Sequence, residues 1–308
     1  MCTAFCQHSF FGRNLDLQRV YGEEVTVTPR RFPLEFRRQP KLDVHYAMIG
    51  AARVQEGIPL YFEAVNEHGL AMAGLSFERD CAYTPPETEG ALAPFEVIPF
   101  VLAQCADVKE AVQLLGDRTV AALPFDESLP VTPLHWFLCD RTSAVAVEPL
   151  EMGLAVCDDP VGVLSNSPPL SYQLTHLSEF ASLQAAEPSS LFDGAVSPRH
   201  RGYGLKGLPG DFTSSSRFVK AAVLRALTPP PEDEAIGVAD AFHLLESVAY
   251  PRGAMLASDG TFAVTQYSCV CSLENGTYYY KTYRNPSVRA VPFSSKDEAT
   301  LMRCPMYK

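Results

Sequence analysis

Short apolar stretches separated by turn residues dominate the chain and predict antiparallel strands. Gly69 in Asn66-Glu67-His68-Gly69 and the pair Asn275-Gly276 are typical of hairpin turns, and the polar segment 140–143 separates two further apolar stretches. The three predicted hairpins pair residues 60–65 with 70–77, 136–139 with 144–148, and 261–273 with 277–283.

Helical periodicity occurs between these strands, at residues 108–115, 216–227 and 233–250. Asp107 and Glu110 form a capping-box pattern before the first helix, and prolines 229–231 end the second. Residues 187–210 are rich in Ser, Pro, Gly and Arg, and they predict a long exposed loop. Strands at both ends of the chain with helices between them indicate an α+β fold, in which helices cover packed sheets.

The composition is that of an ordinary globular protein, with 47% hydrophobic and 20% charged residues among 308. We interpret residues 1–308 as a single domain, because no low-complexity linker divides them. The net charge of −11 argues against nucleic acid and against an anionic membrane surface as partners. Since no apolar run approaches the ~20 residues that span a bilayer and no signal segment opens the chain, we expect a protein that is cytoplasmic, or released without a classical signal.

The nine cysteines predict neither a disulfide framework nor a metal site. Their number is odd, and a protein without a signal peptide is expected to keep its thiols reduced. Cys269-Val270-Cys271 lies in an alternating strand pattern, and its spacing is too tight for a usual zinc knuckle. We therefore assign no metal.

Cys2 is a candidate nucleophile because it directly follows the initiator methionine. Removal of Met1 would leave a thiol and a free α-amino group on one residue. The α-amino group titrates at about 7.7–8.0, so part of it is unprotonated near neutrality and can accept the thiol proton. One residue would then supply both nucleophile and base. The alternative is chance, since a lone cysteine is usually inert.

Arg13 and Asp16 follow Cys2 within a span that fits a strand, a turn and a return strand. In an alternating segment two residues three apart face opposite sides, unless a bulge or turn intervenes. By themselves they are typical of a surface ion pair. Next to an N-terminal cysteine, Arg13 would favour the thiolate and Asp16 would hold the amine.

Two further polar residues, Asn166 and Arg217, each have a structural and a functional interpretation. Asn166 ends an apolar run just before Pro168, and it is either a turn residue or an amide donor to an oxyanion. Arg217 lies near the start of a predicted helix, where its charge opposes the helix dipole. It is either solvated beside the capping residues or ion-paired within a site.

Six stretches taken together and in this order resemble the choloylglycine hydrolase family, which contains bile salt hydrolases and penicillin V acylases. They extend over roughly residues 1 to 285, and singly each is weak. The matching residues are Met1-Cys2-Thr3 with Phe11-Gly12-Arg13-Asn14 and Asp16, Asn66-Glu67-x-Gly69-Leu70-x-Met72-Ala73-Gly74-Leu75, Val131-Thr132-Pro133-Leu134-His135-Trp136, Asn166-x-Pro168, Gly207-Leu208-Pro209-Gly210-Asp211, and Ser216-Arg217-Phe218.

The resemblance implies an N-terminal nucleophile hydrolase with a four-layer αββα sandwich and no metal or organic cofactor. In the family pattern Cys2 matches the nucleophile, Arg13 and Asp16 match its supporting residues, and Asn166 matches the oxyanion side chain. Arg217 matches an arginine of the active-site charge network. Family members are commonly homotetramers, so we expect an oligomer.

The same resemblance implies a bile salt hydrolase that releases glycine or taurine from conjugated bile acids. A penicillin V acylase with the same machinery is the alternative, and a non-catalytic binder of amphipathic acids is another. Ser76 departs from the family, because bile salt hydrolases usually carry Asn there and penicillin acylases tend towards Tyr. An apolar cavity would hold the steroid, and the candidate lining residues besides Ser76 are Leu15, Phe62 and Phe137.

Overall fold

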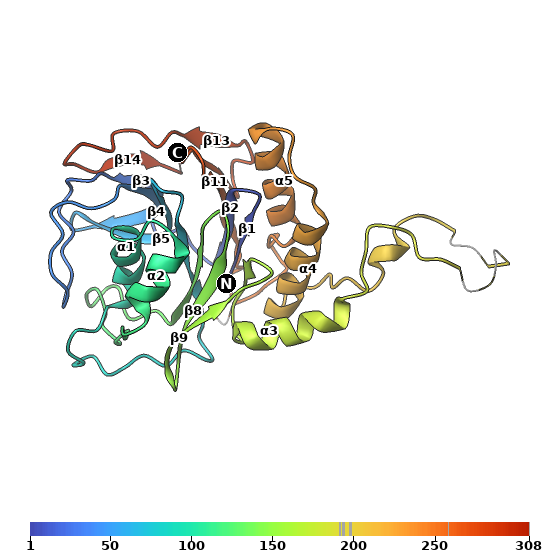
Figure 1. Ribbon diagram of the computed structural model, residues 1–308, viewed down its shortest axis with the longest axis horizontal. Helices are drawn as coiled ribbons and strands as arrows, with labels where there is room; N and C mark the ends of the chain where they lie inside the picture. Colours follow the sequence, from blue (N-terminus) through green and yellow to red (C-terminus); the bar gives the residue numbers. More distant parts are fainter. Residues whose placement is uncertain (191, 193–194, 197–198, 258, 308) are drawn as a thin grey trace.

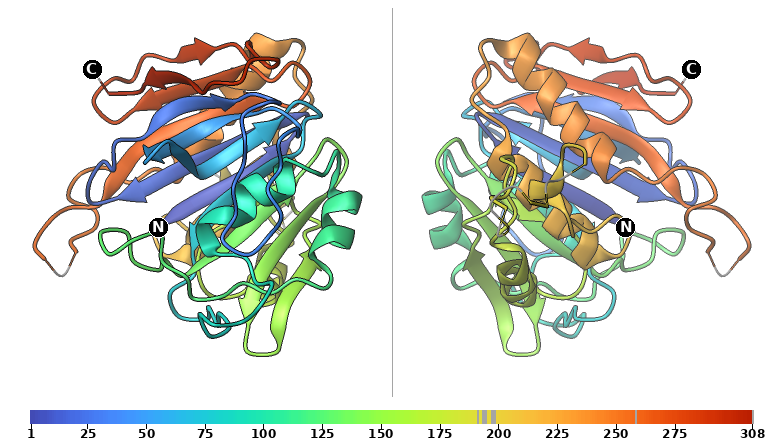
Figure 2. Two further views of the ribbon diagram at one scale, coloured as in Figure 1. Left: turned by 90° about the vertical axis from the view of Figure 1, so that its left-hand side faces the viewer. Right: turned by 90° about the vertical axis from the view of Figure 1, so that its right-hand side faces the viewer.

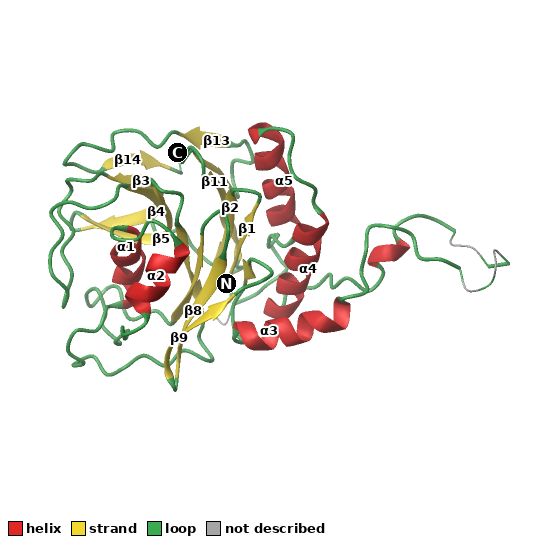
Figure 3. Ribbon diagram, in the orientation of Figure 1, coloured by secondary structure: helices red, strands yellow, loops and turns green. Residues whose placement is uncertain are grey.

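Two antiparallel sheets pack face to face and are covered by helices on both outer faces, which gives four αββα layers (Figures 1 and 3). The computed structural model describes residues 1–307 except 191, 193–194, 197–198 and 258. This arrangement confirms the predicted α+β sandwich.

The two sheets differ in the part of the chain that builds them. One has six strands, in the order β10 (Val163–Leu164), β1 (Cys2–Gln7), β2 (Phe10–Leu17), β11 (Val264–Ser272), β12 (Tyr278–Thr282) and β13 (Arg289–Val291). The other has eight strands, in the order β14 (Met302–Pro305), β3 (Glu24–Thr28), β4 (Met48–Gln55), β5 (Ile58–Asn66), β6 (Ala71–Ser76), β7 (Leu134–Cys139), β8 (Ala144–Leu150) and β9 (Gly153–Asp158).

The helices divide between the two outer faces. The outer layer on the eight-stranded sheet is made of α1 (Val97–Leu102), which contacts β5 and β6, and α2 (Val108–Leu115). On the six-stranded sheet lie α4 (Ser214–Leu227) and α5 (Glu234–Ser247), as the right-hand view of Figure 2 shows, and α3 (Leu170–Leu177) packs on α4. Short 3-10 helices are η1 (Pro94–Glu96), η2 (Ser178–Phe180) and η3 (Tyr203–Leu205).

The three predicted hairpins and three predicted helices are confirmed, with ends that differ by a few residues. The last predicted helix ends at Ser247 rather than at residue 250, and the strand predicted from residue 261 begins at Val264. The predicted loop 187–210 belongs to the excursion drawn to the right in Figure 1, and some of its residues lie outside the described ones. No helix among the described residues is long and apolar enough to cross a membrane.

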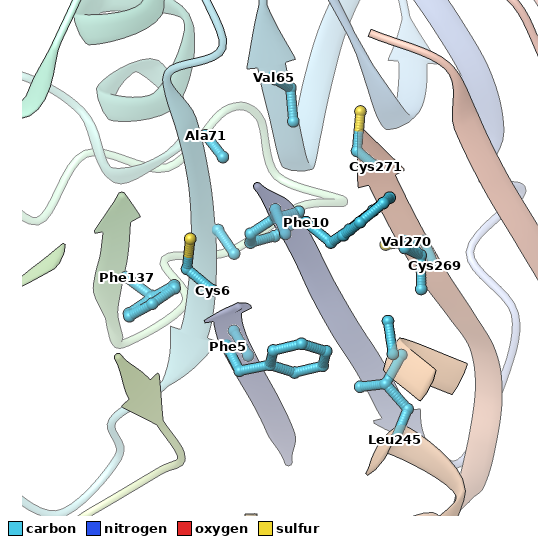
Figure 4. Close-up of a cluster of buried hydrophobic side chains, with 14 of the residues drawn as sticks. Phe5, Cys6, Phe10, Val65, Ala71, Phe137, Leu245, Cys269, Val270 and Cys271 are labelled. Atoms are coloured by element: carbon cyan, nitrogen blue, oxygen red, sulfur yellow. The ribbon is translucent and has the colours of Figure 1, made fainter. Parts of the chain in front are cut away.

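The core has two parts, one on each side of the eight-stranded sheet. The larger part fills the space between the two sheets and continues across the six-stranded sheet to α4 and α5, and Figure 4 shows Phe5, Phe137 and Val270 within it. The smaller part lies between the eight-stranded sheet and α1 and α2. Packing is tight where β1 meets β2, since a Cβ at Gly12 would stand 2.5 Å from the ring of Phe5. Glycine at this position lets the two strands and the ring occupy the same layer.

The β1–β2 hairpin brings the N-terminus into the middle of the molecule (Figure 1). His8 and Ser9 form its turn with positive φ angles of 45° and 67°. The register places Cys2 opposite Leu15. Because side chains alternate along a strand, Arg13 and Leu15 share the face of Cys2, and Asp16 points to the other face.

Candidate active site

Cys2 is almost completely buried, at 3% exposure, at the start of a central strand. Its backbone nitrogen donates a 2.9 Å hydrogen bond to Oδ1 of Asn166. Met1 is attached, and its amino group donates to the carbonyl of Asp16 at 2.6 Å. The chain end is therefore fixed by backbone pairing as well as by side chains.

Arg13 reaches from β2 across to the eight-stranded sheet and contacts the thiol on the way. Its Nη2 donates to Sγ of Cys2 at 3.1 Å and to the carbonyl of Gly74 at 2.8 Å. Its Nη1 donates to Glu63 at 2.6 Å. Burial opposes the charge, but Cys2, Tyr267 and Glu63 raise the pKa of the guanidinium well above its ordinary value. Arg13 thus presents a fixed positive charge to the sulfur.

Asp16 faces the helical layer, as the alternation along β2 predicts, so that Arg13 and Asp16 approach Cys2 from opposite sides of the sheet. Its carboxylate accepts a hydrogen bond from the hydroxyl of Thr265 at 2.5 Å. A register shift in β11 between Thr265 and Tyr267 lies opposite this point. Burial raises the pKa of the Asp16 carboxyl, and the charge of Arg217 opposes this shift.

Asn166 and Arg217 meet above the backbone of Cys2. Nη2 of Arg217 donates to Oδ1 of Asn166 at 2.7 Å, and Nη1 donates to the carbonyl of Cys2 at 2.6 Å. Since Oδ1 accepts from two donors, Nδ2 of Asn166 points the other way and donates to the carbonyl of Ser76 at 2.8 Å. The amide carries a second N–H on the same nitrogen.

Ser214, the first residue of α4, ties the helix to the segment that carries Asn166. Its hydroxyl accepts from the backbone nitrogen of Asn166 at 3.0 Å and donates to the carbonyl of Asn166 at 2.9 Å. It also bonds the hydroxyl of Ser165 at 2.9 Å. The sequence alone gives this serine no role in the site, because its partner lies 48 residues away.

A cavity of about 320 Å³ opens beside Cys2 and has mostly apolar walls. Leu15, Phe62 and Ser76 line it, as predicted. Phe137 does not reach it, because that ring is fully buried in the core between the sheets. Further lining residues, which the sequence did not point out, include Leu17, Tyr61, Phe95, Ile98, Phe125, Leu129, Arg19 and Arg53.

Glu63 is the group in this region that sequence analysis missed as a chemical residue. It stands in an alternating strand, where an acidic residue is usually solvent-facing, but its side chain is fully buried against Arg13. Within the described part of the chain, no group of three or more His, Cys, Asp or Glu side chains converges to hold a metal ion.

Comparisons with known proteins cover nearly the whole chain. A family model described as linear amide C–N hydrolases, choloylglycine hydrolase family, matches residues 2–300. The chain is 38% identical over 314 residues to a bile salt hydrolase/transferase of Lactiplantibacillus plantarum, covering 99% of this chain and 97% of the relative. It is 32% identical over 309 residues to a bile salt hydrolase/transferase of Clostridium perfringens, covering 96% and 94%.

Solved structures show the same fold. The chain superimposes on a conjugated bile acid hydrolase from Clostridium perfringens with a TM-score of 0.91 and 30% identity, covering 100% of this chain and 97% of that one. A penicillin V acylase from Agrobacterium tumefaciens gives 0.77 and 19% identity, covering 98% and 90%, and that likeness concerns the fold alone. The chain therefore belongs to the choloylglycine hydrolase family of linear amide C–N hydrolases, and its fold is that of an N-terminal nucleophile hydrolase.

Proposed function

We propose that this protein hydrolyses the amide bond of glycine- or taurine-conjugated bile acids, with Cys2 as its nucleophile once Met1 has been removed. The observation that carries the proposal is the Cys2 thiol, held 3.1 Å from Nη2 of Arg13 in the wall of a mostly apolar cavity. The names of relatives that match nearly the whole chain support the choice of substrate.

The first step joins the sulfur to the acyl carbon. The thiol gives its proton to the free α-amino group of Cys2, and the thiolate attacks the amide carbonyl. The negative charge that develops on the carbonyl oxygen accepts the second N–H of Asn166 Nδ2 and a backbone N–H near Ser76. Such donors contribute a few kcal/mol to lowering an acyl-transfer barrier.

The second step releases the amino acid and then the bile acid. As the C–N bond breaks, the protonated α-amino group gives its proton to the leaving nitrogen, and a thioester to Cys2 remains. Water then attacks the thioester with the amine as base, which frees the carboxylic acid and restores the thiol. No oxidant or cofactor is needed for this balance.

Two charged side chains would hold the amine and the oxyanion donor in place. Arg217 fixes Asn166 through Oδ1, which leaves Nδ2 to face the cavity side. Asp16 lies beside the chain end, where its carboxylate would attract the ammonium form. Arg19 and Arg53 add positive charge to the cavity wall, which suits an anionic substrate.

Replacement of Cys2 tests the mechanism. Cys2→Ala should lower glycocholate hydrolysis by at least 10³-fold, since the step has no other nucleophile, while the melting temperature stays within a few degrees. Cys6→Ala, on the same strand and with its thiol bonded to the carbonyl of Asp140, is the matched control and should keep its activity. Retained hydrolysis in the Cys2 variant contradicts the mechanism. Intact mass shows whether Met1 is absent from the active protein.

A substrate panel separates the two amidase candidates. Purified protein is assayed with glycocholate, taurocholate and penicillin V at equal concentrations, and kcat/KM is compared. Faster cleavage of either bile salt supports the proposal. Faster cleavage of penicillin V assigns the alternative acylase function. Ser76 in the cavity wall is compatible with either function, because it matches the residue of neither subfamily. Binding without turnover of all three assigns the non-catalytic role.

The proposal extends to the setting of the enzyme. We infer a homotetramer in the cytoplasm of a gut bacterium, because the family resemblance implies oligomers and bile salts are met in the gut. Light scattering after size-exclusion chromatography gives the mass of the particle, and a mass other than four chains contradicts the tetramer.

A further inference from the structure

Glu63 on β5 extends from the eight-stranded sheet into the space beneath Cys2, where it is fully buried. Its two oxygens accept hydrogen bonds from the hydroxyls of Tyr267 at 2.7 Å and Tyr278 at 2.6 Å. Oε2 also accepts from Nη1 of Arg13 at 2.6 Å. A carboxylate held by three such donors keeps one orientation. The mechanism above gives it no role.

The guanidinium of Arg13 is fixed by the same contact. Nη1 is bound to Glu63, while Nη2 is shared between the carbonyl of Gly74 and the sulfur of Cys2. Among the described residues its Nε has no hydrogen-bond partner, so the two terminal nitrogens determine where the group lies. Without the carboxylate, a fully buried cation would face only a carbonyl and a thiol.

We propose that Glu63 is a positioning residue for the nucleophile. It holds the Arg13 guanidinium against the Cys2 sulfur and offsets part of its positive charge, and so it sets how readily the thiol ionises. The kinetic consequence rests on the proposed function, whereas the effect on the thiol does not.

Other ionisable groups surround Arg13 and Glu63, and Glu63→Gln leaves all of them in the protein. They come from the six-stranded sheet, from α4, from the residue before β3, from the chain end and from the C-terminal segment, and they are Asp16, Tyr267, Cys269, Cys271, Tyr278, Arg217, Glu23, Tyr307 and the terminal amine. Burial raises the pKa values of Tyr267 and Tyr278 well above the ordinary range, so both phenols are neutral donors near neutral pH.

The test is the pH dependence of Cys2 alkylation by iodoacetamide in the full chain, measured by mass spectrometry of the N-terminal peptide. All variants carry Cys6→Ala, so that one thiol remains in that peptide. Glu63→Gln removes the negative charge that offsets Arg13 and should move the alkylation midpoint about one unit towards lower pH. A midpoint moved to higher pH would show that the guanidinium has left the sulfur, which also supports the positioning role. An unchanged midpoint would overturn the proposal.

Glu67→Gln is the matched control. Glu67 is a mostly buried carboxylate at the turn of the same β5–β6 hairpin, and it pairs with Arg30 and accepts from the backbone nitrogen of Ala47. Its loss should lower stability and leave the midpoint unchanged. An equal shift in both variants would assign the effect to general loosening of the hairpin and overturn the role of Glu63.

If Glu63→Gln does not fold, the alkylation midpoint of Tyr267→Phe tests the same proposal. It removes one hydrogen bond from the carboxylate, which strengthens the negative field at the thiol, so the midpoint should move slightly to higher pH. An unmoved midpoint in that variant counts against the proposal.

Steady-state kinetics give the second measurement. Glu63→Gln should lower kcat for glycocholate about tenfold and change KM less than about threefold, because Glu63 does not line the cavity. Glu63→Asp, which keeps the charge, should recover part of kcat. If the protein cleaves no bile salt but the midpoint still shifts, the proposed function fails and this inference stands. A loss confined to KM would overturn it.

Discussion

Asp159 is a buried carboxylate at the turn between β9 and β10, and it is 5% exposed. Its oxygens accept hydrogen bonds from the backbone nitrogens of Val161 at 3.0 Å, Gly162 at 2.9 Å and Val163 at 2.9 Å. Burial raises the pKa of this carboxyl to about 6, although the three N–H groups oppose the shift. The folded protein therefore holds a proton here that the unfolded chain releases at lower pH.

This proton predicts how stability changes with pH. Because the folded pKa lies above the unfolded value, the contribution is present at low pH and is lost as pH rises through about 6. The loss amounts to about 3 kcal/mol in the free energy of unfolding. The test compares urea unfolding of the natural protein and of Asp159→Asn at pH 4 and pH 7. Relative to the natural protein, the free energy of unfolding of the variant should rise by about 2.4 kcal/mol between these two pH values. A difference that stays constant with pH contradicts the prediction.

Helix α4 shows why a basic residue stands in the first turn of a helix. Arg217 opposes the dipole there, but its guanidinium is fully buried and donates to Cys2, to Thr3 at 2.5 Å and to Asn166. Thr213 caps the helix by accepting from the backbone nitrogen of Ser216, and the bonds of Ser214 to Asn166 set the distance between the helix and β10. The element holds the site together through its first turn.

Ser214→Ala tests this link. We expect kcat to fall about tenfold with KM nearly unchanged, because the loss of two hydrogen bonds to the Asn166 backbone lets its amide drift from the oxyanion position. The matched control is Ser215→Ala, which changes the neighbouring residue of the same helical turn. Equal kcat in both variants would show that the hydroxyl of Ser214 does not position Asn166.

Elements with a strong local signal could be predicted from the sequence, and elements that depend on packing could not. The Asn275-Gly276 turn fixed one hairpin in advance, and Asp107 accepts from the backbone nitrogen of Glu110 as the capping pattern predicts. Strand β4 was not predicted, because its run of Ala, Gly and Arg has weak β-propensity. Gly50 is needed there, since a Cβ would stand 2.0 Å from the carbonyl of Glu63.

The residues of the site could likewise be predicted where the sequence carries a local pattern, and not where their role depends on packing. Cys2, Arg13, Asp16, Asn166 and Arg217 were proposed because their stretches match a family pattern, and the structure brings all five together. Phe137 was proposed from its type alone, and type does not distinguish a cavity wall from the core. The acid pairing with Arg13 was missed, because two distant strands must pack before it becomes visible.

At the scale of the whole molecule, both ends of the chain contribute strands to the sheets. β14 pairs with β3 and covers its edge, and Arg303 on β14 pairs with Glu24 on β3. The C-terminal strands lie at the upper edge of the molecule in Figure 2. All residues of β3 are buried, so a β3 without β14 would present an unpaired backbone edge to other chains.

Truncation after Ala299 should therefore cause aggregation. Without β14, we expect a lower melting temperature and particles above the native mass, because exposed strand edges pair with other chains. Thermal unfolding and light scattering measure both effects. A chain that ends at Tyr307 keeps β14 and is the control. Native mass and melting temperature in the shorter chain would refute the role of this strand.

The site bonds run across the space between the two sheets rather than within either one. Arg13 and Asn166 donate from the six-stranded side to the carbonyls of Gly74 and Ser76 on the other sheet. The rate of catalysis therefore depends on how accurately the two sheets are placed relative to each other. Enlarging Ala73, which is fully buried between the two sheets, would push them apart by fractions of an ångström, and cooperative unfolding tolerates such a shift whereas directional hydrogen bonds do not. Such core variants will lose turnover well before they lose their fold.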